Sequence, residues 1–264
     1  MIPKSTFFKS LLTTLIYYLL TSGISIILYL TLGKYLLNIN IDYLSILDSM
    51  VYLIILIILI SFRKRTNLEY WSDNNSLIFY LISIIIIAFT FRISVDPIYR
   101  FDLIFNSSDF PTNFSREVSL FKKFAVFLNI VLLAPIVEEL VFRGIILNKI
   151  VKEYGIITSL LVSSLLFSLI HINFYPFSFN IISFLNAFFL GIITGLIFLK
   201  IGIKYSITLH FLINLIWYIL NYFLSEEYWK ALIHLEFNFL YWIIVTLGLA
   251  ILLFSLSSIN KKTK

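Results

Sequence analysis

Two glutamates and an arginine interrupt one of the most hydrophobic stretches of the sequence. Glu138, Glu139 and Arg143 stand within the run Ala-Pro-Ile-Val-Glu-Glu-Leu-Val-Phe-Arg-Gly, which begins at residue 134. At the depth of a bilayer each ionisable side chain costs at least about 2.5–3.5 kcal/mol on insertion scales, so each one needs a partner or a function. A carboxylate held away from bulk water can take a proton from a water molecule and later return it, which is the chemistry of hydrolysis.

The spacing of these three residues divides their expected roles. Glu139 and Arg143 are four residues apart, so on a helix they share a face and can form an ion pair. Glu138 points about 100° away around the helix and is not neutralised by the same contact, which makes it the candidate general base. The competing interpretation places all three groups in water at a helix end, but apolar residues 145–147 continue the run past Arg143. Pro135 predicts a kink just before the two acids.

Two of the three histidines are also expected inside apolar helices. His171 follows Phe167 by four residues and His210 precedes Asn214 by four, so each pair is expected on one helix face. A single histidine in a helix is more often structural than catalytic. Three polar clusters on separate apolar helices nevertheless need partners, and the nearest partners are one another, so we expect them to converge at one polar cavity. His234 falls in an acidic loop and is discounted.

The chemistry open to such a cavity is hydrolysis by activated water. Glu138 would serve as general base, one histidine would orient the water, and the other histidine with Asn214 would donate hydrogen bonds to a developing oxyanion. Cysteine is absent, and the sequence contains neither a His-Glu-x-x-His zinc motif nor a glycine-rich phosphate loop. Ser168 and Ser206 lack a base at a diagnostic spacing. Glutamate and histidine also suit zinc, so a metal stays an open alternative that the spacing does not require.

The composition indicates which elements must position these residues. Of the 264 residues, 60% are hydrophobic and 13% are charged, and the mean hydropathy is +0.99. In soluble domains about 45–50% of the residues are apolar and about 25% are charged. The net charge of +6 comes from short basic clusters between apolar runs, which is a membrane topology signal rather than a nucleic-acid surface. We therefore expect an all-α, polytopic transmembrane helix bundle, because an open sheet cannot span a bilayer. About eight spans follow from apolar runs at residues 11–32, 45–62, 77–91, 124–148, 156–174, 179–199, 206–224 and 238–258.

The lysines and arginines predict the orientation of this bundle. In an eight-span topology most of the basic clusters fall on one side, so both termini are expected in the cytoplasm. The stretch 96–118 is expected to form an extracytoplasmic loop that can include a short interfacial helix. The clusters on the predicted cytoplasmic side are residues 4 and 9, 63–65, 149 and 152, 200 and 204, and 261–264.

The chain divides into three expected parts. Residues 1–119 hold the first three helices and the outer loop, 120–224 hold a core of helices 4–7, and 225–264 hold the last helix and a basic tail. All the candidate site residues fall in the core. Gly191 and Gly195 lie there too, at a spacing that allows close helix packing.

The sequence resembles the CPBP family of intramembrane proteases, also called the Abi or CAAX-prenyl-protease-2 family. The resemblance covers about residues 120–224 and rests on four motifs in the same order, with no departure at the motif positions. The motifs are Glu138-Glu139-x-x-x-Arg143, Phe167-x-x-x-His171, Gly191-x-x-x-Gly195 and His210-x-x-x-Asn214.

The resemblance implies a role for each matching residue. Glu138 would activate water together with His171, and Glu139 would pair with Arg143 to shape the site. His210 and Asn214 would form the oxyanion hole. No metal or other cofactor is expected, because the best understood member of the family resembles a metal-independent glutamate protease.

The resemblance also implies a membrane-associated peptide or protein as substrate, a lipid bilayer as surroundings and no nucleic acid. The Ile-, Asn- and Lys-rich composition is typical of a bacterial plasma-membrane protein, and bacterial relatives are linked to peptide maturation and bacteriocin self-immunity. Two other classes compete with the protease. One is a non-catalytic bacteriocin-immunity or binding protein, and the other is a proton-coupled transporter, for which the expected internal repeat is not visible. Counted along the helices, His171 falls nearer the outer side and His210 nearer the cytoplasm, so their convergence requires staggered helix ends.

Overall fold

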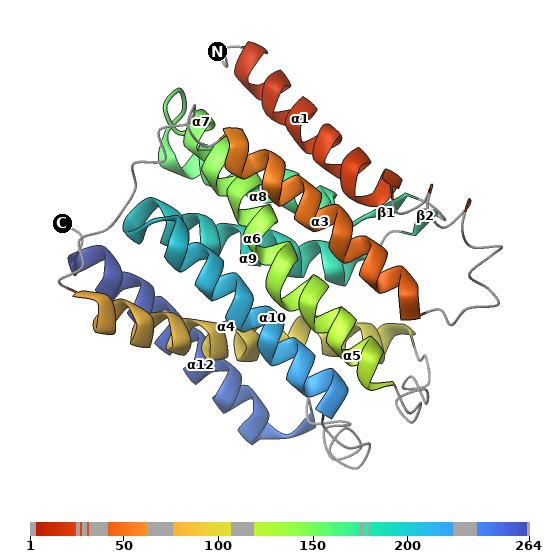
Figure 1. Cartoon of the computed structure of the whole chain (residues 1–264). Coiled ribbons are helices and arrows are strands. Elements are labelled where there is room, and N and C mark those ends of the chain that lie inside the picture. The colour runs from red at the N-terminus through yellow and green to blue at the C-terminus, as the bar shows by residue number, and fades with distance from the viewer. Residues whose placement is uncertain are drawn as a thin grey trace. The chain divides into compact units, whose positions relative to one another are not determined.

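The computed structural model describes residues 4–24, 27, 31, 42–62, 76–106, 119–174, 177, 178, 180–223 and 237–262. Nearly all of these residues are helical (Figure 1). The chain forms two compact units. Unit 1 comprises Met1–Trp71 and Ser119–Ile207, and unit 2 comprises Ser72–Val118 and Thr208–Lys264.

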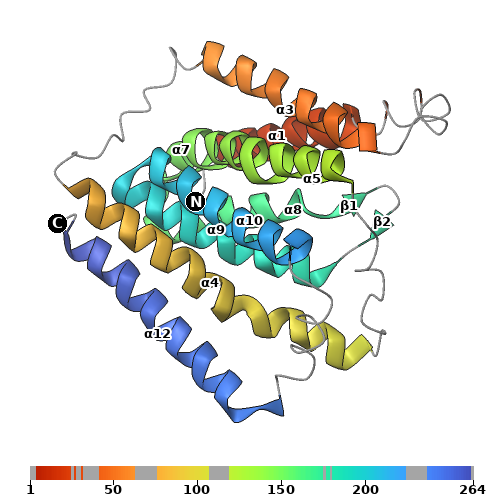
Figure 2. The same ribbon diagram turned by 60° about the horizontal axis from the view of Figure 1, so that its bottom comes forward.

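Unit 1 is built around one continuous helical segment, residues 120–150, which carries the two glutamates and the arginine. Figure 2 shows α3 on one side of this segment and α8 and α9 on the other. The α8 and α9 helices pack closely along each other. The central segment consists of α5 (Leu120–Val126), η5 (Phe127–Leu133), α6 (Ala134–Glu139), η6 (Leu140–Leu147) and α7 (Asn148–Ile150); the surrounding helices are α1 (Lys4–Tyr18), η1 (Leu19–Gly23), α3 (Asp42–Phe62), α8 (Ile156–Leu169), α9 (Ile181–Ile201) and the first turns of α10 (Ile203–Phe223).

Polar and flexible residues set the helix boundaries of unit 1. Ser119 caps the central segment by accepting a hydrogen bond from the Lys122 N–H at 3.1 Å. Asn180 caps α9 by accepting from the N–H groups of residues 182 and 183 at 2.9 and 3.0 Å. Such side chains satisfy backbone donors that the first helical turn leaves unpaired. Gly202 adopts a φ of 98°, which only glycine tolerates easily, and so lets α10 start directly after α9.

Unit 2 contains α4 (Leu77–Asn106), α12 (Phe239–Lys262) and the remainder of α10. The α4 and α12 helices pack along each other. A Cβ on Gly248 of α12 would lie 2.9 Å from Cγ2 of Ile93 in α4, so the glycine allows the two backbones to approach closely. Tyr241 donates a hydrogen bond of 3.0 Å to Asp96, and Arg92 lies 4.0 Å from the same carboxylate.

The structure confirms a polytopic helical membrane protein, with helical segments at all eight predicted positions. Five of them, among the described residues, are long and apolar enough to cross a membrane. The apolar helices at Asp48–Ser61 and Ile156–Leu169 are shorter, and part of the first predicted span lies outside the described residues, so the finer expectation of eight full spans stays a prediction. The five long segments are Leu77–Ile98, Leu120–Ile150, Ile181–Ile201, Ile203–Phe223 and Phe239–Lys262.

Three local expectations were wrong. The third helix does not end at residue 91, because α4 continues through Pro97 to Asn106, inside the predicted 96–118 loop. The fifth helix ends at Leu169 and not at residue 174. A short antiparallel hairpin follows it, with β1 (Asn173–Phe174) paired to β2 (Phe177–Ser178), whereas no strand was expected.

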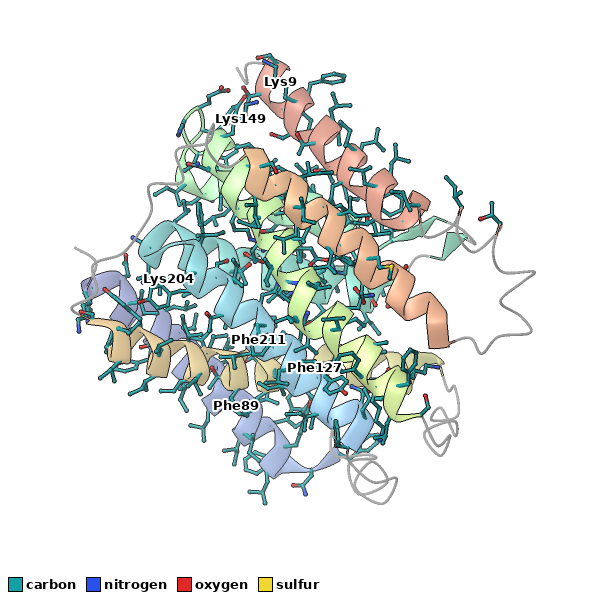
Figure 3. The ribbon with its side chains drawn as sticks, viewed as in Figure 1. Lys9, Phe89, Phe127, Lys149, Lys204 and Phe211 are labelled. Carbon is teal, nitrogen blue, oxygen red and sulfur yellow. The ribbon has the colours of Figure 1, made fainter. Side chains whose placement is uncertain are left out.

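Three basic clusters lie at one end of unit 1, as the sequence predicted. Figure 3 shows Lys9 and Lys149 at the same end. The Thr6 hydroxyl in α1 donates a 2.6 Å hydrogen bond to Glu153 in the turn after α7, which fixes this proximity. The Leu147–Leu160–Phe198 cluster, against which Ile203 packs, brings the α9–α10 connection and its lysines to that end as well. The basic cluster at 63–65 falls outside the described residues. Which end faces the cytoplasm stays a prediction, and so does the division into three parts.

Candidate active site

The two glutamates lie in α6, a short α-helical segment of about one and a half turns between the π-helical stretches η5 and η6. Ala134 donates its N–H to the carbonyl of Asn129, five residues back, at the end of the first stretch. Pro135 explains this change of pitch, since it has no N–H to continue the α-helical ladder. The second stretch begins directly after Glu139 and contains Arg143. Such π-helical insertions are rare and frequently occur at functional sites.

Glu139 and Arg143 form the predicted ion pair. Arg143 Nε lies 3.1 Å from Glu139 Oε2, and the two side chains are 1% and 0% exposed. This burial rules out the interpretation in which both groups are solvated at a helix end. The pairing therefore compensates two charges that are removed from water, as buried charges require.

Three further residues, from two other helices, form hydrogen bonds with this pair. Arg143 Nη2 donates to the Thr194 hydroxyl and, at 3.2 Å, to the Gly191 carbonyl, both in α9. The Ser206 hydroxyl, from the first turns of α10, donates to Glu139. These hydrogen bonds tie the central segment to α9 and α10, so they fix the position of the motif within unit 1. No motif in the sequence points to Thr194, and Ser206 stands out there only as a serine without a catalytic base at a diagnostic spacing.

Close helix packing brings α9 within reach of this network. A Cβ on Gly191 would lie 2.9 Å from Cβ and 3.0 Å from Cα of Ser164 in α8. A Cβ on Gly195 would meet Cδ2 of Leu160 at 2.7 Å. The predicted packing role of the two glycines is therefore confirmed, with α8 as the partner helix.

An aromatic contact leads from Arg143 toward His171. The guanidinium carbon lies 4.6 Å from the centre of the Phe167 ring, at a cation–π distance. The ring of Phe167 is in turn 5.2 Å from that of Phe142 and 4.9 Å from that of His171. In unit 1, Phe167 thus links the ion pair to the histidine.

His171 lies in the turn after α8 and is exposed, and not inside the helix as predicted. Its Nδ1 is 3.0 Å from the Phe167 carbonyl, one of the acceptors that a helix end leaves unpaired. A carbonyl can only accept, so Nδ1 carries the hydrogen of this bond. In a neutral imidazole the other nitrogen, Nε2, is then an acceptor that can receive a hydrogen bond from water.

Glu138 is buried, with 7% of its surface exposed. Its charge acts on Tyr17 of α1 and on Tyr52 of α3. Both tyrosines lie in the part of unit 1 that precedes the central segment by more than 60 residues of sequence. No motif or spacing connects them to the glutamate, so nothing in the sequence pointed to them.

His210 and Asn214 lie in the part of α10 that belongs to unit 2. They are four residues apart within one helix, which confirms that they share a face. His210 is buried, at 2% exposure. Their convergence with Glu138 and His171 stays a prediction, and His234 falls outside the described residues.

Among the described residues, no three or more His, Cys, Asp or Glu side chains gather in a way that could hold a metal ion. The expectation of a reaction without a metal stays a prediction. The polar groups that contact the Glu139–Arg143 pair include the hydroxyls of Thr194 and Ser206 and the carbonyl of Gly191. The Arg143 guanidinium already balances the charge of the Glu139 carboxylate.

Comparison with known proteins identifies the segment that carries these residues. Residues 120–216 match the family described as type II CAAX prenyl endopeptidase Rce1-like. The match includes all six predicted site residues and confirms the resemblance on which their roles were assigned. No curated protein and no solved structure matches the chain.

Proposed function

We propose that the chain is an intramembrane endopeptidase. Its residues 120–216 form a domain of the Rce1-like type II CAAX prenyl endopeptidase family. It hydrolyses a peptide bond of a membrane-associated peptide or protein with water activated by Glu138. The observation that carries this proposal is the fully buried ion pair of Glu139 and Arg143. This pair commits the second glutamate to structure, while Glu138 presents its carboxylate to a different face of the same helix.

The reaction begins with proton transfer from water to Glu138. The ionised carboxylate takes one proton as the water oxygen attacks the carbonyl carbon of the scissile bond, which gives a tetrahedral intermediate. Glu138 then returns this proton to the leaving nitrogen as the carbon–nitrogen bond breaks. The products are a carboxylic acid and an amine, and the glutamate is regenerated.

Histidine and asparagine side chains assist at two points of this reaction. Nε2 of His171 accepts a hydrogen bond from the attacking water and orients it, an arrangement supported by the contact of Nδ1 with the Phe167 carbonyl. His210 and Asn214 donate hydrogen bonds to the developing oxyanion. A single donor of this kind contributes about 2.7–4 kcal/mol to transition-state stabilisation.

The substrate is inferred to reach the site from the bilayer. Glu138 lies in a segment, Leu120–Ile150, that is long and apolar enough to cross a membrane, so a hydrophobic peptide or a lipid-modified terminus is the expected class of substrate. We further propose, from the basic clusters and the composition of the sequence, that the enzyme acts in a bacterial plasma membrane with both termini in the cytoplasm. Peptide maturation and bacteriocin self-immunity are the processes that the resemblance suggests.

The proposal is tested by mass spectrometry of membrane peptides from cells that carry either the wild-type chain or Glu138→Gln. The variant keeps the shape of the side chain but removes the base, so we expect the cleavage products to fall by about 10²–10⁴-fold. Glu153→Gln is the matched control. Glu153 is exposed in the turn after α7, and the amide oxygen of glutamine can still accept the hydrogen bond from Thr6, so cleavage should be unchanged. Wild-type levels of product from Glu138→Gln would contradict the role of the glutamate, and a set of peptides identical to that of cells without the chain would favour a non-catalytic binding protein.

A further inference from the structure

Tyr17 of α1 has a buried hydroxyl that meets no hydrogen-bond partner among the described residues, as does Ser10 of the same helix, but only Tyr17 lies beside Glu138. The residue is 4% exposed, and its oxygen is fully covered. Buried hydroxyls are nearly always paired, so an unpaired one calls for an explanation in structure or in function. The position of the residue within unit 1 supplies one.

Tyr17 faces the helix side on which Glu138 lies. Its ring packs edge-on against the ring of Phe142, with the ring centres 5.7 Å apart. Phe142 follows Glu138 by four residues, and residues at this spacing are neighbours on one side of a helix. The charge of Glu138 acts on the Tyr17 hydroxyl, and the Tyr52 hydroxyl is the other group beside it. The Tyr17 oxygen therefore lies close to the carboxylate, although hydrogen-bond geometry between them is not met.

The packing of the N-terminal helices holds both tyrosines in this place. The α1 helix contacts α7 and α8, and α3 contacts η5 and α6. Figures 1 and 2 both show α3 lying along the central segment. Neither helix falls within residues 120–216, which match the family, so this contact with the glutamate comes from outside the matched domain.

We propose that Tyr17 is a positioning residue for Glu138. Its hydroxyl donates a hydrogen bond to one oxygen of the ionised carboxylate, so that the other oxygen is left to accept the proton from water. A small rotation of the Glu138 side chain closes the bond, and Tyr52 limits the motion of the Tyr17 hydroxyl from α3. This inference rests on the proposed function for its catalytic consequence, but the contact itself does not.

The kinetic test uses Tyr17→Phe, which removes only the hydroxyl and keeps the ring against Phe142. We expect kcat to fall by about 10- to 100-fold, because a misdirected base loses the alignment that proton transfer needs, while KM stays within twofold. Tyr18→Phe is the matched control on the next position of α1, and its kcat should equal that of the wild type. The thermal midpoint of Tyr17→Phe should fall by only a few degrees, since the variant loses one hydrogen bond and keeps the packing of the ring, so it stays folded in the assay.

A spectroscopic test examines the contact without any substrate. In protein labelled with ¹³C-glutamate, the infrared band of Glu138 is identified by subtracting the spectrum of Glu138→Gln from that of the wild type. A hydrogen bond from Tyr17 predicts that this band moves in Tyr17→Phe and stays in place in Tyr18→Phe.

The two tests separate the possible failures. An active wild type, an inactive Glu138→Gln and a fully active Tyr17→Phe with an unmoved band would overturn the role of Tyr17 and leave the protease proposal intact. A wild type that cleaves no peptide, together with a band that moves in Tyr17→Phe, would overturn the protease proposal and retain the contact. A loss of kcat that is matched by an equal loss in Tyr18→Phe would also overturn the role of Tyr17.

Discussion

Replacing Arg143 with methionine would leave the Glu139 carboxylate fully buried without its cation. The two groups are 3.1 Å apart and at most 1% exposed, so water cannot replace the lost charge without opening the bundle. Removing one partner of a buried pair costs about 3–5 kcal/mol. Arg143 also contributes hydrogen bonds to α9 and the contact with the Phe167 ring, so we expect Arg143→Met to lie in the upper part of this range.

The assay is reversible unfolding in mixed micelles, followed by circular dichroism, for a double-mutant cycle of Arg143→Met and Glu139→Gln. In the double variant neither charge is buried, so it should be more stable than Arg143→Met alone, with a coupling energy of about 1–3 kcal/mol between the two positions. Lys152→Met is the control, because Lys152 is exposed in the turn after α7, and it should change the free energy of unfolding by less than about 0.5 kcal/mol. A loss of less than about 1 kcal/mol for Arg143→Met, below the range for a buried pair, would show that the pair is hydrated and refute this reasoning.

Glycine substitutions give two further predictions. Gly191→Ala should lower both stability and activity strongly, because its Cβ would collide with the backbone of Ser164. Gly195→Ala should have a smaller effect, since the atom that its Cβ meets is the flexible end of Leu160. Thermal midpoints of the two variants test this order, and a lower midpoint for Gly195→Ala than for Gly191→Ala would contradict it. Gly202→Ala should destabilise the chain by about 1–3 kcal/mol, because an alanine at a φ of 98° is strained, and an unchanged midpoint would show that the α9–α10 connection can relax.

The sequence was sufficient for the features that depend on the cost of burying charge. Hydropathy located the helical segments, and the spacing of Glu139 and Arg143 predicted an ion pair that the structure contains. The proline before the acids was read as a kink, and the pitch of the helix does change there. Each of these follows from a local rule that needs no knowledge of tertiary contacts.

Helix ends were less predictable, because apolar residues continue past them. Ile170 and Ile172 are as hydrophobic as the helix that precedes them, yet α8 ends at Leu169 and the His171 ring binds a freed carbonyl. Conversely α4 continues through Pro97, in a region whose charged residues suggested a loop. In unit 2 the Asp96 carboxylate is near Arg92 and accepts from Tyr241, a pairing that hydropathy does not register.

The partners of the site residues were beyond the reach of the sequence. Thr194 and Ser206 contact the ion pair through helices that are more than 50 residues away from it. Tyr17 and Tyr52 approach Glu138 from helices without any motif. Such contacts depend on which helix faces pack together, and a single sequence does not contain that information.

The central claim is that Glu138 acts as a general base on water, and turnover in H₂¹⁸O tests it most directly. With a cleaved membrane peptide identified, purified enzyme is allowed a limited number of turnovers, and ¹⁸O is measured both in the new carboxyl terminus of the product and in the proteolytic fragment that contains Glu138. The account predicts one ¹⁸O in the product, none in the Glu138 fragment, and no turnover by Glu138→Gln. Appearance of ¹⁸O in the Glu138 fragment would show that the glutamate attacks the substrate itself, and labelled product from Glu138→Gln would show that another group activates the water.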